Sequence, residues 1–162
     1  LKIAPMTSQL NPCEYSPLSP AAVEEIFLQS GALMEGHFLL ASGRHSARYI
    51  EKFRVLEQPR IASQLCGEIA RRFAKDDISC VIGPVTGGIL LAFDVARHLG
   101  CRAVYAERDE SGQGFTLRRG FRLEPNERVI VVEDIVTTGG SALKVVELAR
   151  EHGADVVGVG LL

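Results

Sequence analysis

The chain has 162 residues, of which 46% are hydrophobic, 23% charged and 6% aromatic. This is the composition of one globular domain with at most a small appendage, and it excludes a disordered or fibrous chain. Eighteen basic residues against 20 acidic ones give a formal charge of −2, so we expect no nucleic-acid partner. The longest uncharged stretch, residues 78–93, is too short for a membrane helix and is broken by Pro84, so we expect no membrane partner.

The cysteines and the chain ends bear on where the protein works. None of the four cysteines forms a CxxC pair, and three of them lie in apolar segments. We therefore expect reduced core cysteines in a cytoplasmic protein, and the N-terminus has no pattern of a secretion signal. The chain begins at Leu1 and stops at Leu162 inside a predicted strand, so we expect it to be trimmed at one or both ends. The cysteines are Cys13, Cys66, Cys80 and Cys101.

The first third of the chain predicts a loose arm and then a small helix-plus-hairpin unit. Residues 1–18 contain three prolines and no hydrophobic periodicity. Ser19 followed by Pro20 is typical of a helix start. We assign residues 19–57 to the small unit. Its predicted elements are a helix over residues 19–30 and strands over 37–41 and 48–53, with the polar turn 42–46 between the strands.

From residue 58 onward, predicted helices alternate with short, wholly apolar strands. This alternation predicts an α/β fold with a mostly parallel central sheet that is covered by helices on both faces. We assign residues 58–162 to this core. Residues 107–127 are mixed and contain three glycines. Strands are predicted over residues 78–83, 102–106, 128–133 and 156–162, and helices from Pro59, over 87–99 and over 141–152.

The stretch that carries the chemistry is residues 129–144, VIVVEDIVTTGGSALK. Its apolar strand leads into Glu133 and Asp134, then into the turn 137–141, and then into a helix. In an open parallel sheet, ligands bind at the carboxyl ends of the strands. Such a turn offers backbone N–H groups, hydroxyls and the positive end of a helix dipole, and its glycines allow close approach. The pattern therefore predicts a cradle for a phosphate monoester.

The two carboxylates point to a second part of the same ligand. A phosphate repels negative charge, so Glu133 and Asp134 are expected to face sugar hydroxyls or a hydrated Mg²⁺. A 5-phosphorylated ribose satisfies both the cradle and the acids. The stretch is neither a Walker loop nor a dinucleotide fingerprint, because it lacks GxxxxGK[ST] and GxGxxG. The alternative is an ordinary strand end and capped helix with two solvated acids.

The segment VIVVEDIVTTGGS closely resembles the phosphoribosyl-pyrophosphate (PRPP) signature of the type I phosphoribosyltransferases. Residues 38–53, FLLASGRHSARYIEKF, look like the N-terminal hood motif of the orotate branch of that family, and residues 81–88, VIGPVTGG, also fit it. The resemblance covers roughly residues 20–162. It implies the type I phosphoribosyltransferase fold with a small N-terminal hood. It also implies transfer of a phosphoribosyl group from PRPP to orotate, giving orotidine 5′-phosphate and pyrophosphate in pyrimidine biosynthesis.

The resemblance implies a role for each matching residue. The acid pair would bind the ribose 2- and 3-hydroxyls, directly or through Mg²⁺ that PRPP carries near Asp134, with no metal site of the protein's own. The catalytic residues would be Glu133, Asp134 and Arg108, and the orotate-binding residues Thr137, Arg44 and Tyr49. The PRPP-binding residues would be Glu133, Asp134, Ile135, Val136, Thr137, Thr138, Gly139, Gly140 and Ser141, with Val85, Thr86, Gly87 and Gly88 of a second loop.

Residues 107–121, ERDESGQGFTLRRGF, occupy the place of the family's mobile catalytic loop. The resemblance implies a homodimer in which this loop reaches the neighbouring site. A polar stretch with glycines between two strands is also a plausible lid on its own terms. Arg108, Arg118 and Arg119 would neutralise pyrophosphate there. The alternative is an exposed hairpin with solvated charges.

The chain departs from the best-known orotate enzymes at several positions. Their mobile-loop lysines and histidine are absent from residues 107–121, and two further lysines correspond to Ala41 and Gly87. The family arginine that grips orotate falls beyond Leu162. Two alternatives stay open: a phosphoribosyltransferase for a purine or uracil base, and a regulator that senses PRPP without catalysis.

Overall fold

The computed structural model describes residues 16–40, 42–136 and 139–162. Several positions used above lie outside the described residues. They are the predicted arm up to residue 15 with Cys13, and Ala41, Thr137 and Thr138.

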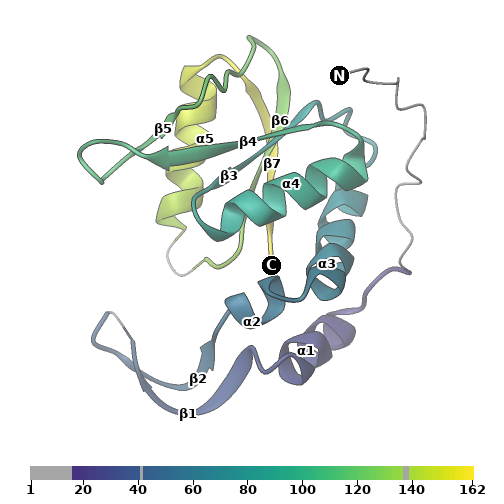
Figure 1. Ribbon diagram of the computed structural model, residues 1–162, viewed down its shortest axis with the longest axis vertical. Coiled ribbons are helices and arrows are strands. Elements are labelled where there is room, and N and C mark those ends of the chain that lie inside the picture. The colour runs from purple at the N-terminus through teal and green to yellow at the C-terminus, as the bar shows by residue number, and fades with distance from the viewer. Residues whose placement is uncertain (1–15, 41, 137–138) are drawn as a thin grey trace, which may run out of the picture.

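A five-stranded sheet forms the centre of the molecule (Figure 1). The strand order is β5-β4-β3-β6-β7, in which β5 runs antiparallel to β4 and the other neighbours are parallel. The predicted mostly parallel α/β sheet is therefore confirmed. The strands are β3 (Cys80–Pro84), β4 (Arg102–Arg108), β5 (Phe115–Leu117), β6 (Arg128–Glu133) and β7 (Asp155–Leu161).

Helices cover both faces of the sheet because the central strands are apolar on both sides. Helix α5 (Gly140–Glu151) packs on the face that carries Ile82 and Val131. Helices α3 (Pro59–Arg72) and α4 (Gly87–Leu99) pack on the opposite face. Within the described ranges, none of the helices is long and apolar enough to cross a membrane.

The hood lies beside the core, below it in Figure 1. Ser19 caps α1 by accepting a hydrogen bond from the Ala22 N–H. Val55 of α2 packs in the hood cluster, whereas Leu56 packs in the core cluster. Helix α2 is thus shared by the two units, and the predicted boundary at residue 57 stays a prediction. The elements are α1 (Pro20–Gln29), β1 (Leu33–Leu39), β2 (His45–Ile50) and α2 (Phe53–Leu56).

The two hood strands differ from their predicted bounds. Strand β1 begins four residues earlier than expected, and β2 runs over 45–50 instead of 48–53. Pairing across the hairpin sets these limits, because Leu33 lies opposite Ile50 and Leu39 opposite His45. Phe53, predicted as the end of a strand, begins α2 instead.

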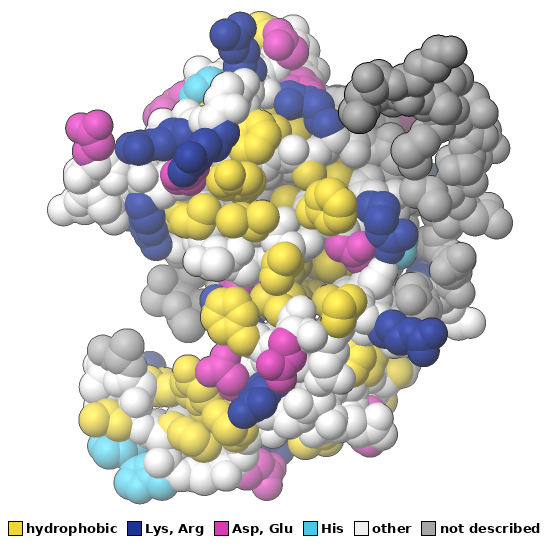
Figure 2. Space-filling view, viewed as in Figure 1, with side chains coloured by type: hydrophobic (Ala, Val, Ile, Leu, Met, Phe, Trp, Pro, Cys, Tyr) yellow, Lys and Arg dark blue, Asp and Glu magenta, His cyan; other side chains and the backbone are white. Residues whose placement is uncertain are grey.

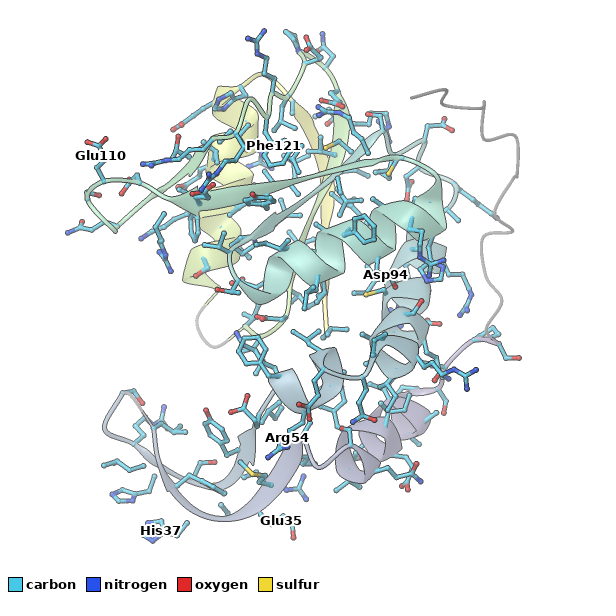
Figure 3. The ribbon with its side chains drawn as sticks, in the orientation of Figure 1. Glu35, His37, Arg54, Asp94, Glu110 and Phe121 are labelled. Carbon is cyan, nitrogen blue, oxygen red and sulfur yellow. The ribbon has the colours of Figure 1, made fainter. Side chains whose placement is uncertain are left out.

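Residues 107–121 contain a β-hairpin, as the alternative above stated. Strand β4 continues to Arg108 and pairs with β5, which the sequence pattern did not reveal. Arg119 Nε donates to Glu107 at 2.8 Å across the hairpin. Glu110 lies at the projecting tip (Figure 3). Movement of this segment during catalysis stays a prediction.

Three of the cysteines match the expectation of unpaired core thiols. Cys66 and Cys80 are buried and Cys101 is half-buried, and all three are free. Burial raises the pKa of the Cys80 thiol to about 12 and that of Cys101 to about 11. These thiols are therefore poor nucleophiles at neutral pH.

The close approach of β3 to α4 gives a test of the fold. A Cβ at Gly83 would lie 2.2 Å from the carbonyl oxygen of Gly88, which is backbone and cannot turn away. We expect Gly83→Ala to lower the free energy of unfolding by about 2–3 kcal/mol in urea denaturation.

Gly36→Ala in β1 is the matched control. Its Cβ would meet only the ring of Phe38, at 3.3 Å, and that ring can turn. The expected change is about 0.5 kcal/mol or less. Equal losses in the two variants would contradict the backbone overlap as the cause.

Candidate functional site

The two acids lie at the carboxyl end of β6, as predicted. Glu133 is only 8% exposed and Asp134 only 5%. Strand β6 is held between β3 and β7, which fixes the backbone that carries both carboxylates. Two neighbouring carboxylates removed from water repel one another, so each needs a partner of its own.

Glu133 is directed to the start of α5. The Ala142 N–H, in the first turn of that helix, interacts with its carboxylate and lowers the pKa of Glu133. Burial raises the pKa of Glu133 and the charge of Asp134 raises it further. The Ala142 N–H and the positive charges of Lys52 and Arg108 act in the opposite direction. Glu133 therefore anchors α5 to the strand, a local role that the sequence analysis did not anticipate.

Asp134 is paired with Lys52, a residue that the sequence analysis did not single out. The Lys52 Nζ lies 2.9 Å from both carboxylate oxygens and donates its hydrogen bond to Oδ1. In the part of the chain that the structure describes, no group donates a hydrogen bond to the buried Oδ2. The only sequence signal for Lys52 was its place near the end of the hood motif, 82 residues before Asp134.

Two glycine-bearing loops open at the same edge of the sheet as the acids. Residues 85–88 lead from the end of β3 into the first residues of α4, and residues 134–139 join β6 to α5. Strands β3 and β6 are neighbouring and parallel. Gly139 has a φ of 79° as the residue that precedes α5, a conformation that favours glycine. Gly87 lies against the acid pair, since a Cβ there would fall 1.6 Å from Asp134 Oδ2. The structure thus brings both predicted PRPP loops to the acids.

A cavity of about 470 Å³ separates the hood from the loop after β6. The hollow between the two units is visible in Figure 2. Tyr49 lines the cavity and stacks on Phe38 with ring centroids 5.5 Å apart. Arg44 is exposed at the hairpin turn and is not among the lining residues. The lining residues are Leu40, Arg48, Tyr49, Ile50, Glu51, Lys52, Phe53, Ile135 and Val136.

The three loop arginines have different surroundings. Arg108 ends β4, lies 4.3 Å from the centroid of the Phe115 ring and lowers the pKa of Glu133 by its charge. Arg119 is engaged by Glu107. Arg118 is exposed on the hairpin. Of these three arginines, Arg108 is therefore the one whose charge acts on the acid pair.

Comparison with known proteins places this site in a family. A model of the phosphoribosyl transferase domain matches residues 54–162. The chain is 53% identical over 137 residues to orotate phosphoribosyltransferase of Pelotomaculum thermopropionicum, which covers 85% of this chain and 71% of that protein. It is 48% identical over 138 residues to the Thermotoga maritima protein of the same name, covering 85% and 73%. The chain belongs to the orotate phosphoribosyltransferase family.

Solved structures agree with this membership. The orotate phosphoribosyltransferase of Aeropyrum pernix has a TM-score of 0.72 and 32% identity, covering 86% of this chain and 80% of that one. An adenine phosphoribosyltransferase of Trypanosoma brucei has a TM-score of 0.67 at 22% identity, covering 91% and 69%, and shows the fold alone. The type I phosphoribosyltransferase fold and the transferase class expected for an orotate phosphoribosyltransferase are thus confirmed.

The buried acid pair predicts a pH-dependent stability. Because burial raises the folded-state pKa of Glu133 above its ordinary 4.5, ionising this carboxyl weakens the folded state. This loss of folding free energy is absent below pH 4.5, the ordinary pKa. It develops as the pH rises through the higher pKa of Glu133 in the folded state. We expect Glu133→Gln to have a higher free energy of unfolding than the unsubstituted protein at neutral pH. The difference should shrink as the pH falls toward 4, in urea denaturation at each pH.

Glu110→Gln, at the exposed hairpin tip, is the control for the loss of one carboxylate (Figure 3). It should shift stability little at any pH. A Glu133→Gln variant that is less stable than the unsubstituted protein at neutral pH would show that the anchor to α5 outweighs the cost of burial.

Proposed function

We propose that this chain transfers the phosphoribosyl group of PRPP to N1 of orotate, giving orotidine 5′-phosphate and pyrophosphate in pyrimidine biosynthesis. The observation that carries the proposal is the buried acid pair at the mouth of two glycine loops, beside a cavity that the hood lines. Relatives that carry the orotate name and share about half of the residues support the choice of base. A cytoplasmic setting agrees with three free core cysteines.

The acid pair and the loops would divide the recognition of PRPP between them. Asp134 Oδ2 is a buried acceptor that receives no hydrogen bond from the described residues, which suits a ribose hydroxyl. The loop after β6 leads to the N-terminus of α5, where N–H groups and the helix dipole favour the 5-phosphate. Residues 85–88 lie across from it and would contact the pyrophosphate.

The site fits Mg²⁺ that arrives with PRPP. Carboxylate oxygens are the ligands that this ion prefers. Asp134 Oδ2 accepts no hydrogen bond from the described residues, although the Lys52 Nζ lies 2.9 Å from it. No group of three or more His, Cys, Asp or Glu side chains forms a metal site among the described residues. When bound, Mg²⁺ would supply positive charge to the leaving pyrophosphate, and Asp134 would be the residue that holds it.

The reaction needs electrostatics more than proton transfer. The C1–O bond breaks as positive charge develops on the ribose ring, which the neighbouring carboxylates stabilise. Arg108 would add positive charge toward the leaving group. Orotate is already an anion, so no strong base is required, and the described residues that line the cavity include no histidine.

The assignment is tested by following the absorbance of orotate. We expect its band to disappear only when PRPP and Mg²⁺ are both present with the purified protein. Asp134→Asn should lower kcat/KM by about a hundredfold or more while the protein stays folded. Uracil and purine bases are the control substrates. Consumption of one of them and not of orotate would move the assignment to another phosphoribosyltransferase, and PRPP binding without turnover of any base would favour a regulator.

We further propose a homodimer, in which the β4–β5 hairpin reaches the neighbouring site. Helix α4 presents Leu90 and Phe93 to solvent, 52% and 68% exposed, and Figure 2 shows hydrophobic side chains gathered over this helix. An apolar helix face of this kind is suited to a second copy of the chain. The hairpin tip, marked by Glu110, projects from the body of the molecule (Figure 3).

Phe93→Glu should convert the dimer to a monomer, because a charge would then be buried in the interface. Sedimentation analysis measures the mass of each form. Leu28→Glu on α1 of the hood, a similarly exposed apolar residue, should leave the dimer intact. A Phe93→Glu protein that still sediments as a dimer would rule out this face.

A further inference from the structure

We propose that Lys52 is a positioning residue for PRPP, a cation from the hood that orients Asp134 and offsets its charge as the phosphorylated ribose binds. The inference rests on the proposed function and adds to it a residue outside both PRPP loops. The contact that suggests it joins Lys52 Nζ to both oxygens of Asp134, at 2.9 Å each.

The place of Lys52 allows it to act on bound substrate. Its side chain is 31% exposed and lines the cavity between hood and core, whereas Asp134 is almost wholly buried. The ammonium of Lys52 therefore meets the acid, and its side chain borders the space where substrate would enter. A surface ion pair is weak, but a pair with one buried partner is far less screened by water and salt.

The backbone of Lys52 is held in place by its neighbours. Its carbonyl accepts hydrogen bonds from the N–H groups of Val55 and Leu56, which are buried in α2. The preceding residue, Glu51, donates its N–H to the carbonyl of Ala32 at 2.8 Å. The ammonium thus stands at the root of the hood hairpin, not on its exposed turn. A charge on a fixed backbone orients its partner without a large loss of entropy on binding.

The orientation of Asp134 depends on this contact. Oδ2 lies against Gly87, where the absence of a Cβ leaves room for the carboxylate. Nothing else in the described residues donates a hydrogen bond to the Asp134 side chain. Without Lys52 the carboxylate would stay buried but would lose the only hydrogen-bond donor that the described residues give it. The unpaired carboxylate would then turn, and it would present a poorer acceptor to the ribose hydroxyls.

The balance of positive and negative charges at the site also supports a role for Lys52 in PRPP binding. PRPP brings phosphate and pyrophosphate charges to a site that already holds two buried acids. Lys52 and Arg108 are the cations whose charges act on Glu133, and Arg108 is exposed at the end of β4. Lys52 is the one in direct contact with an acid of the pair, so its removal should weaken binding of the anionic substrate most.

The test measures binding of PRPP with Mg²⁺ by titration calorimetry, without orotate. We expect Lys52→Met to raise the Kd for PRPP by about tenfold or more, and Lys52→Arg to stay within about threefold of the unsubstituted protein. The Kd for orotate, measured with pyrophosphate present, should change by less than about threefold in both. Arg54→Met removes an exposed cation two residues away that pairs with Glu57 three positions along the chain, and is the matched control.

A double-mutant cycle tests whether Lys52 acts through Asp134. Lys52→Met should weaken PRPP binding in the unsubstituted chain, yet add little to the loss in an Asp134→Asn background, about threefold at most. Circular dichroism and thermal unfolding check that each variant is folded. Lys52→Gln takes the place of the methionine variant if that protein does not fold.

The outcomes separate this inference from the proposed function. If the unsubstituted chain does not bind PRPP, both fail. If it binds PRPP and Lys52→Met binds equally well, only the role of Lys52 fails. A loss confined to orotate affinity would instead assign the ammonium to the base, and would overturn a role toward PRPP. Fully additive losses with Asp134→Asn would show that the two residues act independently, which also contradicts the proposal.

Discussion

Two carboxylates buried next to each other at the end of β6 are the constraint on which the rest of the site depends. Side by side and away from water, they are stable only if each finds its own partner. Glu133 interacts with the first turn of α5, and Asp134 forms an ion pair with Lys52 of the hood. The helix that follows the phosphate loop and the hood are thereby attached to two consecutive residues, the last of β6 and the first of the loop after it.

Glycines make the second loop fit against the first. A Cβ at Gly83 would overlap the backbone of Gly88, and a Cβ at Gly87 would overlap the Asp134 carboxylate. Because neither glycine has a Cβ, β3 can pack closely against α4, and α4 can pack closely against Asp134. A lysine at position 87, as in the best-known orotate enzymes, would require Asp134 to move. In this chain the cation that meets the acid is Lys52 of the hood.

The positive charges of the β4–β5 hairpin come from arginines and not from lysines. Of these arginines, Arg119 is bound to Glu107 and Arg108 is stacked on Phe115. Arginine stays charged at all ordinary pH values, so it can stabilise a leaving anion but cannot serve as a proton donor. A mechanism based on positioning and charge suits such a hairpin, since orotate enters as an anion.

Local pattern in the sequence determined most of the helices, the apolar strands of the sheet and the two glycine loops, because each depends on residues a few positions apart. The helix that begins at Pro59 and the strand that ends at Glu133 were predictable for that reason. The register of the hood hairpin and the three-residue β5 were not, because pairing with a partner strand defines them. The contact of Lys52 with Asp134 was also decided only by the tertiary structure. It joins residues 82 positions apart, and no spacing rule within one segment can reveal which buried acid a distant lysine will meet.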